Sequence, residues 1–256
     1  MIHHYHGVPI FYRCLGTGPT LVLLHGFLES NAIWDALLPE LVVAHQVVLI
    51  DLPGHGKSGI IDTVHSMEQM ATIVKEVLDA EEIRGVTLVG HSMGGYVALA
   101  FLEQYPHYVN SFVLMNSTTR ADSPERKINR QRALDLVAQN KQSFVQLTIP
   151  ALFSKENLNY FRDDIKSLVS IAAAFSSEGI RAAISGMAQR TDRTRILKNY
   201  EGPKFIIAAK DDPVVPWDES QAIASETNSK LFELDGGHMS WLEQKAEVVK
   251  ILHFIE

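Results

Sequence analysis

Residues 86–95 read Val-Thr-Leu-Val-Gly-His-Ser-Met-Gly-Gly, and this stretch decides the fold. Its first four residues form a short, largely apolar run that predicts a buried strand, and the Ala- and Leu-rich segment 96–105 predicts a helix. Between them lies Gly-x-Ser-x-Gly, centred on Ser92, in the strand–turn–helix context that gives this motif its meaning. Gly90 and Gly94 suit a turn that is too tight for side chains. We therefore expect the Ser92 hydroxyl to project from the carboxyl end of the strand.

The rest of the chain alternates apolar runs with helical patterns, which predicts a doubly wound, mostly parallel α/β sheet. The further buried strands are expected over residues 20–24, 47–50, 111–115, 205–209 and 231–234. A hairpin over residues 2–6 and 10–14 suits an edge of the sheet, and residues 33–41 predict a short helix. The segments Ser66-Met-Glu-Gln69 and Ser240-Trp-Leu-Glu243 both match a capping box, so each is expected to open a helix.

The segment 117–188 breaks this alternation, because it holds no apolar run of comparable strength. Its composition predicts helices over residues 126–140, 142–153, 158–175 and 178–189. A helical insertion of this length between two strands is best explained as a cap over the carboxyl edge of the sheet. The sequence therefore predicts a three-part organisation: residues 1–116 and 189–256 form the two parts of the α/β core, and residues 117–188 form the helical cap.

Composition narrows the class of protein. The chain has 256 residues, of which 46% are hydrophobic, enough for one large globular domain. Its net charge of −7 gives no basic footprint for nucleic acid. Cys14 is the only cysteine, which excludes an intramolecular disulfide and a Cys-based zinc site. Residues 1–6 lack the apolar core of a signal peptide, and no apolar run approaches the ~20 residues of a membrane helix. We expect a cytoplasmic protein without a membrane partner; nothing predicts its oligomeric state.

A serine hydroxyl needs a base beside it, usually a histidine that a carboxylate holds in one tautomer. Two loops that directly follow predicted strands supply candidates, namely Lys210-Asp-Asp-Pro213 and Asp235-Gly-Gly-His238. Because the carboxyl ends of parallel strands share one edge, both loops should lie at the edge that carries Ser92. We assign Asp212 as the orienting acid and His238 as the base, with Asp211 as the rival acid.

The attacked carbonyl develops an oxyanion, which needs fixed N–H donors. We assign one donor to the Met93 N–H, directly after the serine. The loop His25-Gly-Phe27, which follows an early strand, offers the second donor at the Phe27 N–H. The Phe27 side chain would also form a wall of the pocket, whereas His25 is expected to hydrogen-bond neighbouring loops. This chemistry requires neither a metal nor a cofactor.

Taken together, these motifs resemble the α/β-hydrolase-fold serine hydrolases over the whole chain. The matching segments are residues 25–27, 51–58, 90–95, 212–216 and 236–238. Within that fold the sequence is similar to small carboxylesterases, enol-lactonases and carbon–carbon bond hydrolases of the meta-cleavage type. The resemblance implies carboxylic-ester hydrolysis, through an acyl-enzyme on Ser92, as the commonest activity. Ser92 argues against the haloalkane dehalogenases and most epoxide hydrolases of this fold, which use an aspartate; Ala209 stands where the family often has glycine.

In this interpretation the substrate is a small-molecule ester, and its identity depends on the cap residues. Apolar cap residues such as Phe144 and Phe153 suggest an apolar pocket for short or medium acyl groups, although core packing explains them as well. The cap also contains Arg126, Arg130 and Arg132, which could receive an anionic group of the substrate. A solvated helix face is the preferred interpretation of these arginines. Two other functions stay open, a meta-cleavage carbon–carbon bond hydrolase and a non-enzymatic ligand receptor that retains the hydrolase pocket.

Two further patterns have simpler explanations than a binding site. Gly54-His-Gly-Lys-Ser-Gly59 matches the dinucleotide fingerprint, but residues 60–65 separate it from the next predicted helix. A turn beside the active site is therefore preferred. The histidines at positions 3, 4 and 6 could bind a metal, yet a solvent-facing edge strand accounts for them.

Overall fold

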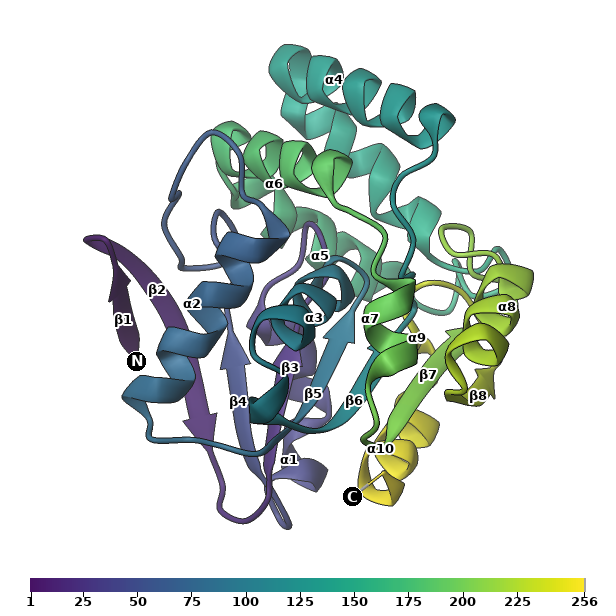
Figure 1. Ribbon diagram of the computed structural model, residues 1–256. Coiled ribbons are helices and arrows are strands. Elements are labelled where there is room, and N and C mark those ends of the chain that lie inside the picture. The colour runs from purple at the N-terminus through teal and green to yellow at the C-terminus, as the bar shows by residue number, and fades with distance from the viewer. Residues whose placement is uncertain (256) are drawn as a thin grey trace.

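The computed structural model describes residues 1–255, in which eight strands form one sheet in the order β1-β2-β4-β3-β5-β6-β7-β8 (Figure 1). The strands are β1 (Ile2–Tyr5), β2 (Val8–Leu15), β3 (Thr20–Leu24), β4 (Gln46–Ile50), β5 (Val86–His91), β6 (Val109–Met115), β7 (Lys204–Ala209) and β8 (Lys230–Leu234). The hairpin strands β1 and β2 are antiparallel, and all pairings from β4 to β8 are parallel. The predicted doubly wound, mostly parallel α/β sheet is confirmed.

Helices cover both faces of this sheet (Figure 1). Those of the core are η1 (Asn31–Ala36), α1 (Leu38–Leu41), α2 (Met67–Ala80), α3 (Met93–Gln104), η2 (Pro106–Tyr108), α7 (Thr194–Asn199), α8 (Trp217–Thr227), α9 (Ser240–Glu243) and α10 (Lys245–Phe254). Helices α2, α3 and α7 pack side by side on one face, and α1 and α10 meet on the other. Every residue of β3 is buried, as expected of a strand covered on both faces.

Two helix predictions need correction. The single helix expected over residues 33–41 is a 3-10 turn, η1, followed by the short α1; Ser30 caps the first and Pro39 stands in the first turn of the second. The capping box at Ser66 is confirmed, because its hydroxyl accepts a hydrogen bond from the Gln69 N–H (3.1 Å). A helix, α9, also begins at Ser240 as expected, but the capping box there is wrong, because Met239 is the N-cap; a break at Gln244 separates α9 from α10.

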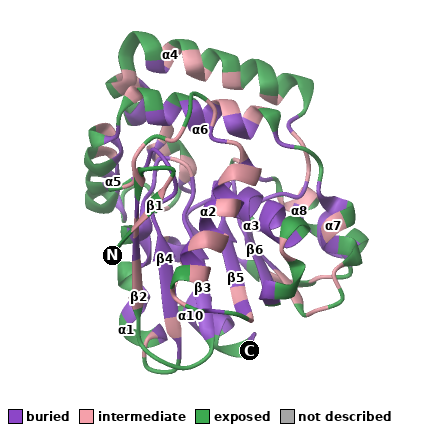
Figure 2. Cartoon of the chain, turned by 60° about the vertical axis from the view of Figure 1, so that its left-hand side comes forward, coloured by how far each residue is buried: buried purple, intermediate pink, exposed green. Residues whose placement is uncertain are grey.

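The segment after β6 forms the helices α4 (Pro124–Thr148), η3 (Pro150–Leu152), α5 (Arg162–Ala174) and α6 (Ser177–Gln189). Helix α4 bends at Asn140, whose φ of −156° is not helical, near the expected boundary between two helices. Helix α6 lies between α4 and the sheet, and α4 turns an exposed surface outward (Figures 1 and 2). A hydrogen bond of 3.0 Å from the His65 N–H to the Ala182 carbonyl ties α6 to the core. The domain limits at residues 117 and 188 stay a prediction.

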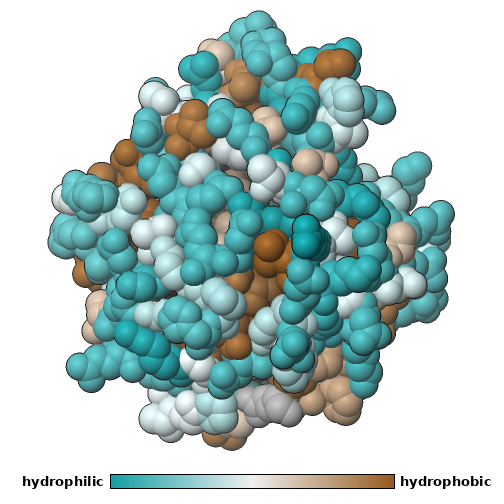
Figure 3. Space-filling model, in the orientation of Figure 1, coloured by the Kyte–Doolittle hydropathy of each residue, from teal (hydrophilic) through white to brown (hydrophobic). Residues whose placement is uncertain are grey.

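The surface is mainly polar on the face drawn in Figure 3, with apolar side chains scattered in small groups. Exposed apolar residues such as Val43, Leu147 and Tyr160 come from separate parts of the chain. Among residues 1–255, no single helix combines the length and apolar character of a membrane span; α5 and α6 together reach both, but they are bent by 99°.

Candidate active site

Ser92 lies on the turn between β5 and α3 with φ 51° and ψ −116°, a backbone conformation that is unfavourable for a residue with a side chain. Close packing imposes it. A Cβ atom on Gly90 would lie 2.5 Å from the Gly94 carbonyl oxygen, and one on Gly94 would lie 2.4 Å from that of Leu24. The Ser92 N–H also donates to the Met115 carbonyl of β6 at 3.0 Å. Strain of this kind clusters at functional sites.

The side chains of Ser92, His238 and Asp212 form a continuous chain of hydrogen bonds. The Ser92 Oγ lies 2.8 Å from His238 Nε2, and His238 Nδ1 lies 2.8 and 2.9 Å from the two oxygens of Asp212. Because a carboxylate only accepts, Nδ1 carries the proton and Nε2 is left to accept from the serine hydroxyl. The rival acid Asp211 is exposed, and its N–H donates to the Gly236 carbonyl (3.0 Å).

The Asp212 carboxylate is buried and surrounded by donors. Its Oδ1 accepts from the Val214 and Val215 N–H groups at 2.8 and 2.9 Å, and its Oδ2 accepts from Asn116 Nδ2 at 3.0 Å. Burial alone would raise the pKa of Asp212, but the attraction of His238 and these hydrogen bonds outweigh it and lower the pKa. Asn116 directly follows β6 with φ 44°; sequence reasoning missed it, although its place after a strand of the same edge was a usable signal.

Glu29 is a second buried acid that sequence reasoning missed, and hydrogen bonds fix its charge. Its Oε2 accepts from the Gly26 N–H (2.6 Å) and faces His91 Nδ1 (3.0 Å), and its Oε1 accepts from Trp241 Nε1 (3.3 Å). The other nitrogen of His91 faces the His238 carbonyl oxygen at 2.9 Å. Both ring nitrogens of His91 therefore face acceptors, and every partner of Glu29 is a donor. A carboxylate beside an imidazolium satisfies all of these contacts.

This ion pair connects three parts of the site, because Gly26 and His238 belong to two different loops and His91 is the last residue of β5. Burial alone would lower the pKa of His91, but the negative charge and hydrogen bond of Glu29 raise it. Burial alone would raise the pKa of Glu29, but the charge of His91 lowers it. The stabilisation is lost as pH falls through the lowered pKa of Glu29, and equally as pH rises through the raised pKa of His91.

The substitution Glu29→Gln should destabilise the fold by about 1–3 kcal/mol. Whichever way the amide is oriented, its NH2 group meets a donor, either Trp241 Nε1 or the Gly26 N–H. Urea unfolding measures the loss. The matched control is Glu247→Gln, which removes a half-exposed partner of Lys250 and should cost under ~1 kcal/mol. Equal losses for the two variants would contradict a charged Glu29–His91 pair.

A third acid, Glu243, holds the loop that carries His238. Its Oε1 accepts from the Gly237 and Met239 N–H groups at 3.0 and 3.3 Å, and its Oε2 accepts from Asn157 Nδ2 at 2.6 Å. The motif that suggested a capping box at residues 240–243 therefore fixes the preceding loop instead. The carboxylate joins this loop to the cap, because Asn157 precedes α5.

Of the two assigned oxyanion donors, one belongs to a cavity-lining residue and the other directly follows Ser92 in the chain. Phe27 lines the cavity above Ser92, and Met93 is the first residue of α3, where an N–H has no partner within the helix. Gly26 brings the backbone close to the serine, since a Cβ there would lie 3.1 Å from the Cβ of Ser92. Their role as oxyanion donors stays a prediction.

His25 makes the loop contacts expected of it. Its Nε2 accepts from the Leu52 N–H at 2.9 Å, so Nδ1 carries the proton and donates to the Gly26 carbonyl at 2.7 Å. Burial lowers the pKa of His25, which matches this neutral form. The fingerprint-like loop 54–59 closes on itself, with the Gly54 N–H donating to the Gly59 carbonyl (2.9 Å). His3 lies on the edge strand β1 and pairs with Glu76 on α2 at 2.9 Å.

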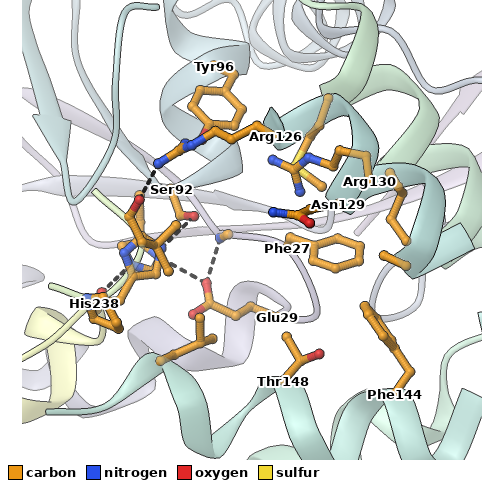
Figure 4. A pocket seen from close by; sticks show the side chains of 18 residues that line it. Phe27, Glu29, Ser92, Tyr96, Arg126, Asn129, Arg130, Phe144, Thr148 and His238 are labelled. Atoms are coloured by element: carbon orange, nitrogen blue, oxygen red, sulfur yellow. Dashed lines mark hydrogen bonds and ion pairs between the residues drawn. The ribbon is translucent and has the colours of Figure 1, made fainter. Parts of the chain in front are cut away.

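A cavity of about 360 Å³ opens above Ser92 and His238 (Figure 4). Phe27 and Phe144 line it, as expected, with ring centroids 6.3 Å apart. Phe153 does not line it: its buried ring packs against Phe161 at 6.0 Å. At this place the cap contacts the site through its main chain rather than through the Phe153 ring: the Leu152 carbonyl of η3 accepts a hydrogen bond from the His238 N–H at 2.8 Å.

The cap arginines fall into two groups. Arg126 and Arg130 line the cavity together with Asn129, and Figure 4 shows all three side chains reaching into it from α4. Arg132 is exposed and interacts with the Asn129 side-chain oxygen at 3.1 Å. The sequence interpretation of a wholly solvated helix face is therefore wrong for Arg126 and Arg130.

A mostly parallel sheet with helices on both faces, and a serine on a strained strand–helix turn, define an α/β hydrolase architecture. Residues 19–245 match the family model of the alpha/beta hydrolase fold, and the chain belongs to that family. The predicted resemblance is confirmed.

Relatives of the chain include several esterases. A thermophilic esterase from Thermogutta terrifontis, determined with malate bound, is 30% identical with a TM-score of 0.91, over 96% of this chain and 92% of that one. A pimeloyl-[acyl-carrier protein] methyl ester esterase from Xanthomonas campestris is 27% identical, over 93% and 95%. An enol-lactonase from Burkholderia xenovorans superposes with a TM-score of 0.92 at 19% identity, over 100% and 99%, and supports the fold alone. The protein is thus an α/β hydrolase with esterase-like relatives.

Proposed function

We propose that this protein hydrolyses carboxylic esters with short or medium acyl groups through an acyl-enzyme on Ser92. The observation that carries the proposal is the unbroken chain of hydrogen bonds from the Asp212 carboxylate through His238 to the Ser92 hydroxyl. A serine becomes a competent nucleophile when a base accepts its proton as it attacks. The nitrogen of His238 that faces the serine is free to do so.

The reaction proceeds in two halves. Ser92 Oγ attacks the ester carbonyl while His238 Nε2 takes its proton, and the Phe27 and Met93 N–H groups stabilise the oxyanion. His238 then protonates the leaving alcohol, which departs and leaves the acyl group on Ser92. Water repeats the attack with His238 again as base, and collapse of the second intermediate releases the acid and restores the serine. Asp212 stays ionised throughout and stabilises the imidazolium.

Three features support ester hydrolysis, and turnover distinguishes it from a receptor that retains the same pocket. The nucleophile, base and acid are already aligned, the cavity opens directly on the serine, and Phe27 and Phe144 give it apolar walls. The esterase names of two relatives, at 30% and 27% identity, agree with ester chemistry.

A panel of p-nitrophenyl esters of increasing acyl length, combined with a fluorophosphonate probe, tests the proposal. We expect hydrolysis that declines for long acyl chains, and labelling of the peptide that contains Ser92, identified by mass spectrometry. Prior incubation with the probe should abolish hydrolysis in proportion to labelling. Absence of turnover with every ester, or labelling at a different serine, would contradict the proposal.

A further inference from the structure

The wall of the cavity that the cap supplies carries positive charge in excess. Arg126 and Arg130 reach the cavity from the first two turns of α4. The Arg126 guanidinium donates one of its five N–H groups to the Val214 carbonyl, which carries no charge. Within residues 1–255 no carboxylate lies within 4.0 Å of it. Among these residues, Arg126 is therefore a cation at the cavity wall with no counter-ion of its own.

The charge of Arg130 is compensated only in part. Its Nε lies 3.1 Å from Asp122 Oδ2, but Asp122 also pairs with Arg190, whose Nη1 lies 2.7 Å from Oδ1. Asp122 and Arg190 are both buried, and the Arg190 guanidinium stacks on the Tyr96 ring at 4.0 Å. Two guanidinium groups thus share one carboxylate. Arg126 and Arg130 thus bring more positive charge to the cavity wall than Asp122 offsets, in a protein whose net charge is −7.

The negative charge at the other end of the cavity does not offset this excess. Glu29 lines the cavity too, but His91 already neutralises it. The cavity therefore presents apolar side chains, the reactive Ser92 and a cationic wall with unused donors. Desolvated guanidinium groups bind planar carboxylates well, because their N–H donors match the two oxygens.

We propose that the substrate is a small ester that also carries a carboxylate, and that Arg126 and Arg130 bind this carboxylate while Ser92 attacks the ester. This inference rests on the proposed ester hydrolysis and adds the class of substrate. Asn129, one turn from Arg126, adds an uncharged donor on the same wall. A volume of about 360 Å³ lies at the small end of ligand pockets and suits a molecule of the size of a dicarboxylic acid monoester.

Matched substrate pairs test the inference. One series compares monomethyl esters of succinic, glutaric and adipic acid with the same esters in which the free carboxylate is a primary carboxamide. A second series carries the charge on the alcohol side, comparing O-acetyl-lactate with O-acetyl-lactamide. For the wild-type protein we expect kcat/KM to be about 10- to 100-fold higher for the charged member in at least one series, the range expected for charge-assisted hydrogen bonds.

Substitutions identify the groups responsible. In Arg126→Gln and in Arg130→Gln the ratio of kcat/KM between charged and neutral esters should fall at least about 10-fold, and Arg126→Lys should retain part of it. Arg132→Gln, on the same helix but exposed, should keep the wild-type ratio. If Arg126 only fixes the Val214 loop, its substitution will lower both rates equally and leave the ratio unchanged, which would overturn the inference. A wild-type protein that hydrolyses neutral esters without any preference would also overturn it, while one that hydrolyses no ester would refute the proposed function instead.

Discussion

Replacing Ser92 with alanine is expected to lower kcat for ester hydrolysis by about 10⁴- to 10⁶-fold while leaving the fold intact. The Oγ atom is the group that bonds to the acyl carbon, and the neighbouring His238 cannot take over that role at its position. The residual rate would come from the oxyanion donors and from binding alone. Steady-state hydrolysis of the best nitrophenyl ester measures the effect, and thermal unfolding verifies that the variant is folded.

The controls for this prediction follow from the hydrogen-bond chain. His238→Ala should cause a loss of similar size, and the double variant should lose little more, because the two side chains act as one unit. Ser225→Ala, at an exposed position on α8, should leave kcat unchanged. A Ser92→Ala variant that kept more than about a tenth of the activity would rule out the acyl-enzyme mechanism.

The arrangement of the sheet could be predicted because local pattern and global fold agree. Largely apolar runs such as residues 20–24 and 86–89 are what parallel strands buried on both faces require. The ends of those strands locate the loops, so the gathering of Ser92, Asp212 and His238 at one edge followed from chain order alone. Helix ends were less predictable: the pattern at Ser240 matched a capping box, but the tertiary contacts of Glu243 determined the loop geometry.

The supporting residues could not be predicted, because their partners are distant in the sequence. Glu29 contacts His91 and Trp241, which are far away in the sequence, and the residues next to Glu29 do not indicate that its carboxylate is buried and charged. Helix α4 is polar on most sides, so periodicity could not indicate that Arg126 and Arg130 face the cavity while Arg132 faces solvent. The assignment of Phe153 to the pocket could not be decided from the sequence either, because an aromatic residue in a cap can fill a pocket or the cap's own core.

The second large effect is expected at the acid that orients His238: Asp212→Asn should lower kcat by roughly 10⁴-fold, whereas the neighbouring Asp211 serves as the control. The Val214 and Val215 N–H groups require an acceptor at the Oδ1 position. The asparagine oxygen would satisfy them, which leaves its NH2 group facing His238 Nδ1 and Asn116 Nδ2. A donor at that place favours the tautomer of His238 with its proton on Nε2, and that nitrogen then cannot accept the proton of Ser92.

The matched control is Asp211→Asn, one residue away, which removes the same charge from an exposed carboxylate and should change kcat by less than about threefold. Both variants are measured with the same ester, and both should fold, because asparagine preserves the shape of aspartate. The pKa of Asp212 is lowered in the fold, so its contribution to stability is present above its unfolded pKa and is lost as pH falls through the lowered value. The Asp212→Asn variant should accordingly lose the part of the acid sensitivity that this carboxylate causes, as urea unfolding at a series of pH values would measure. A large loss of kcat in Asp211→Asn with near-normal turnover in Asp212→Asn would reverse the assignment of the acid.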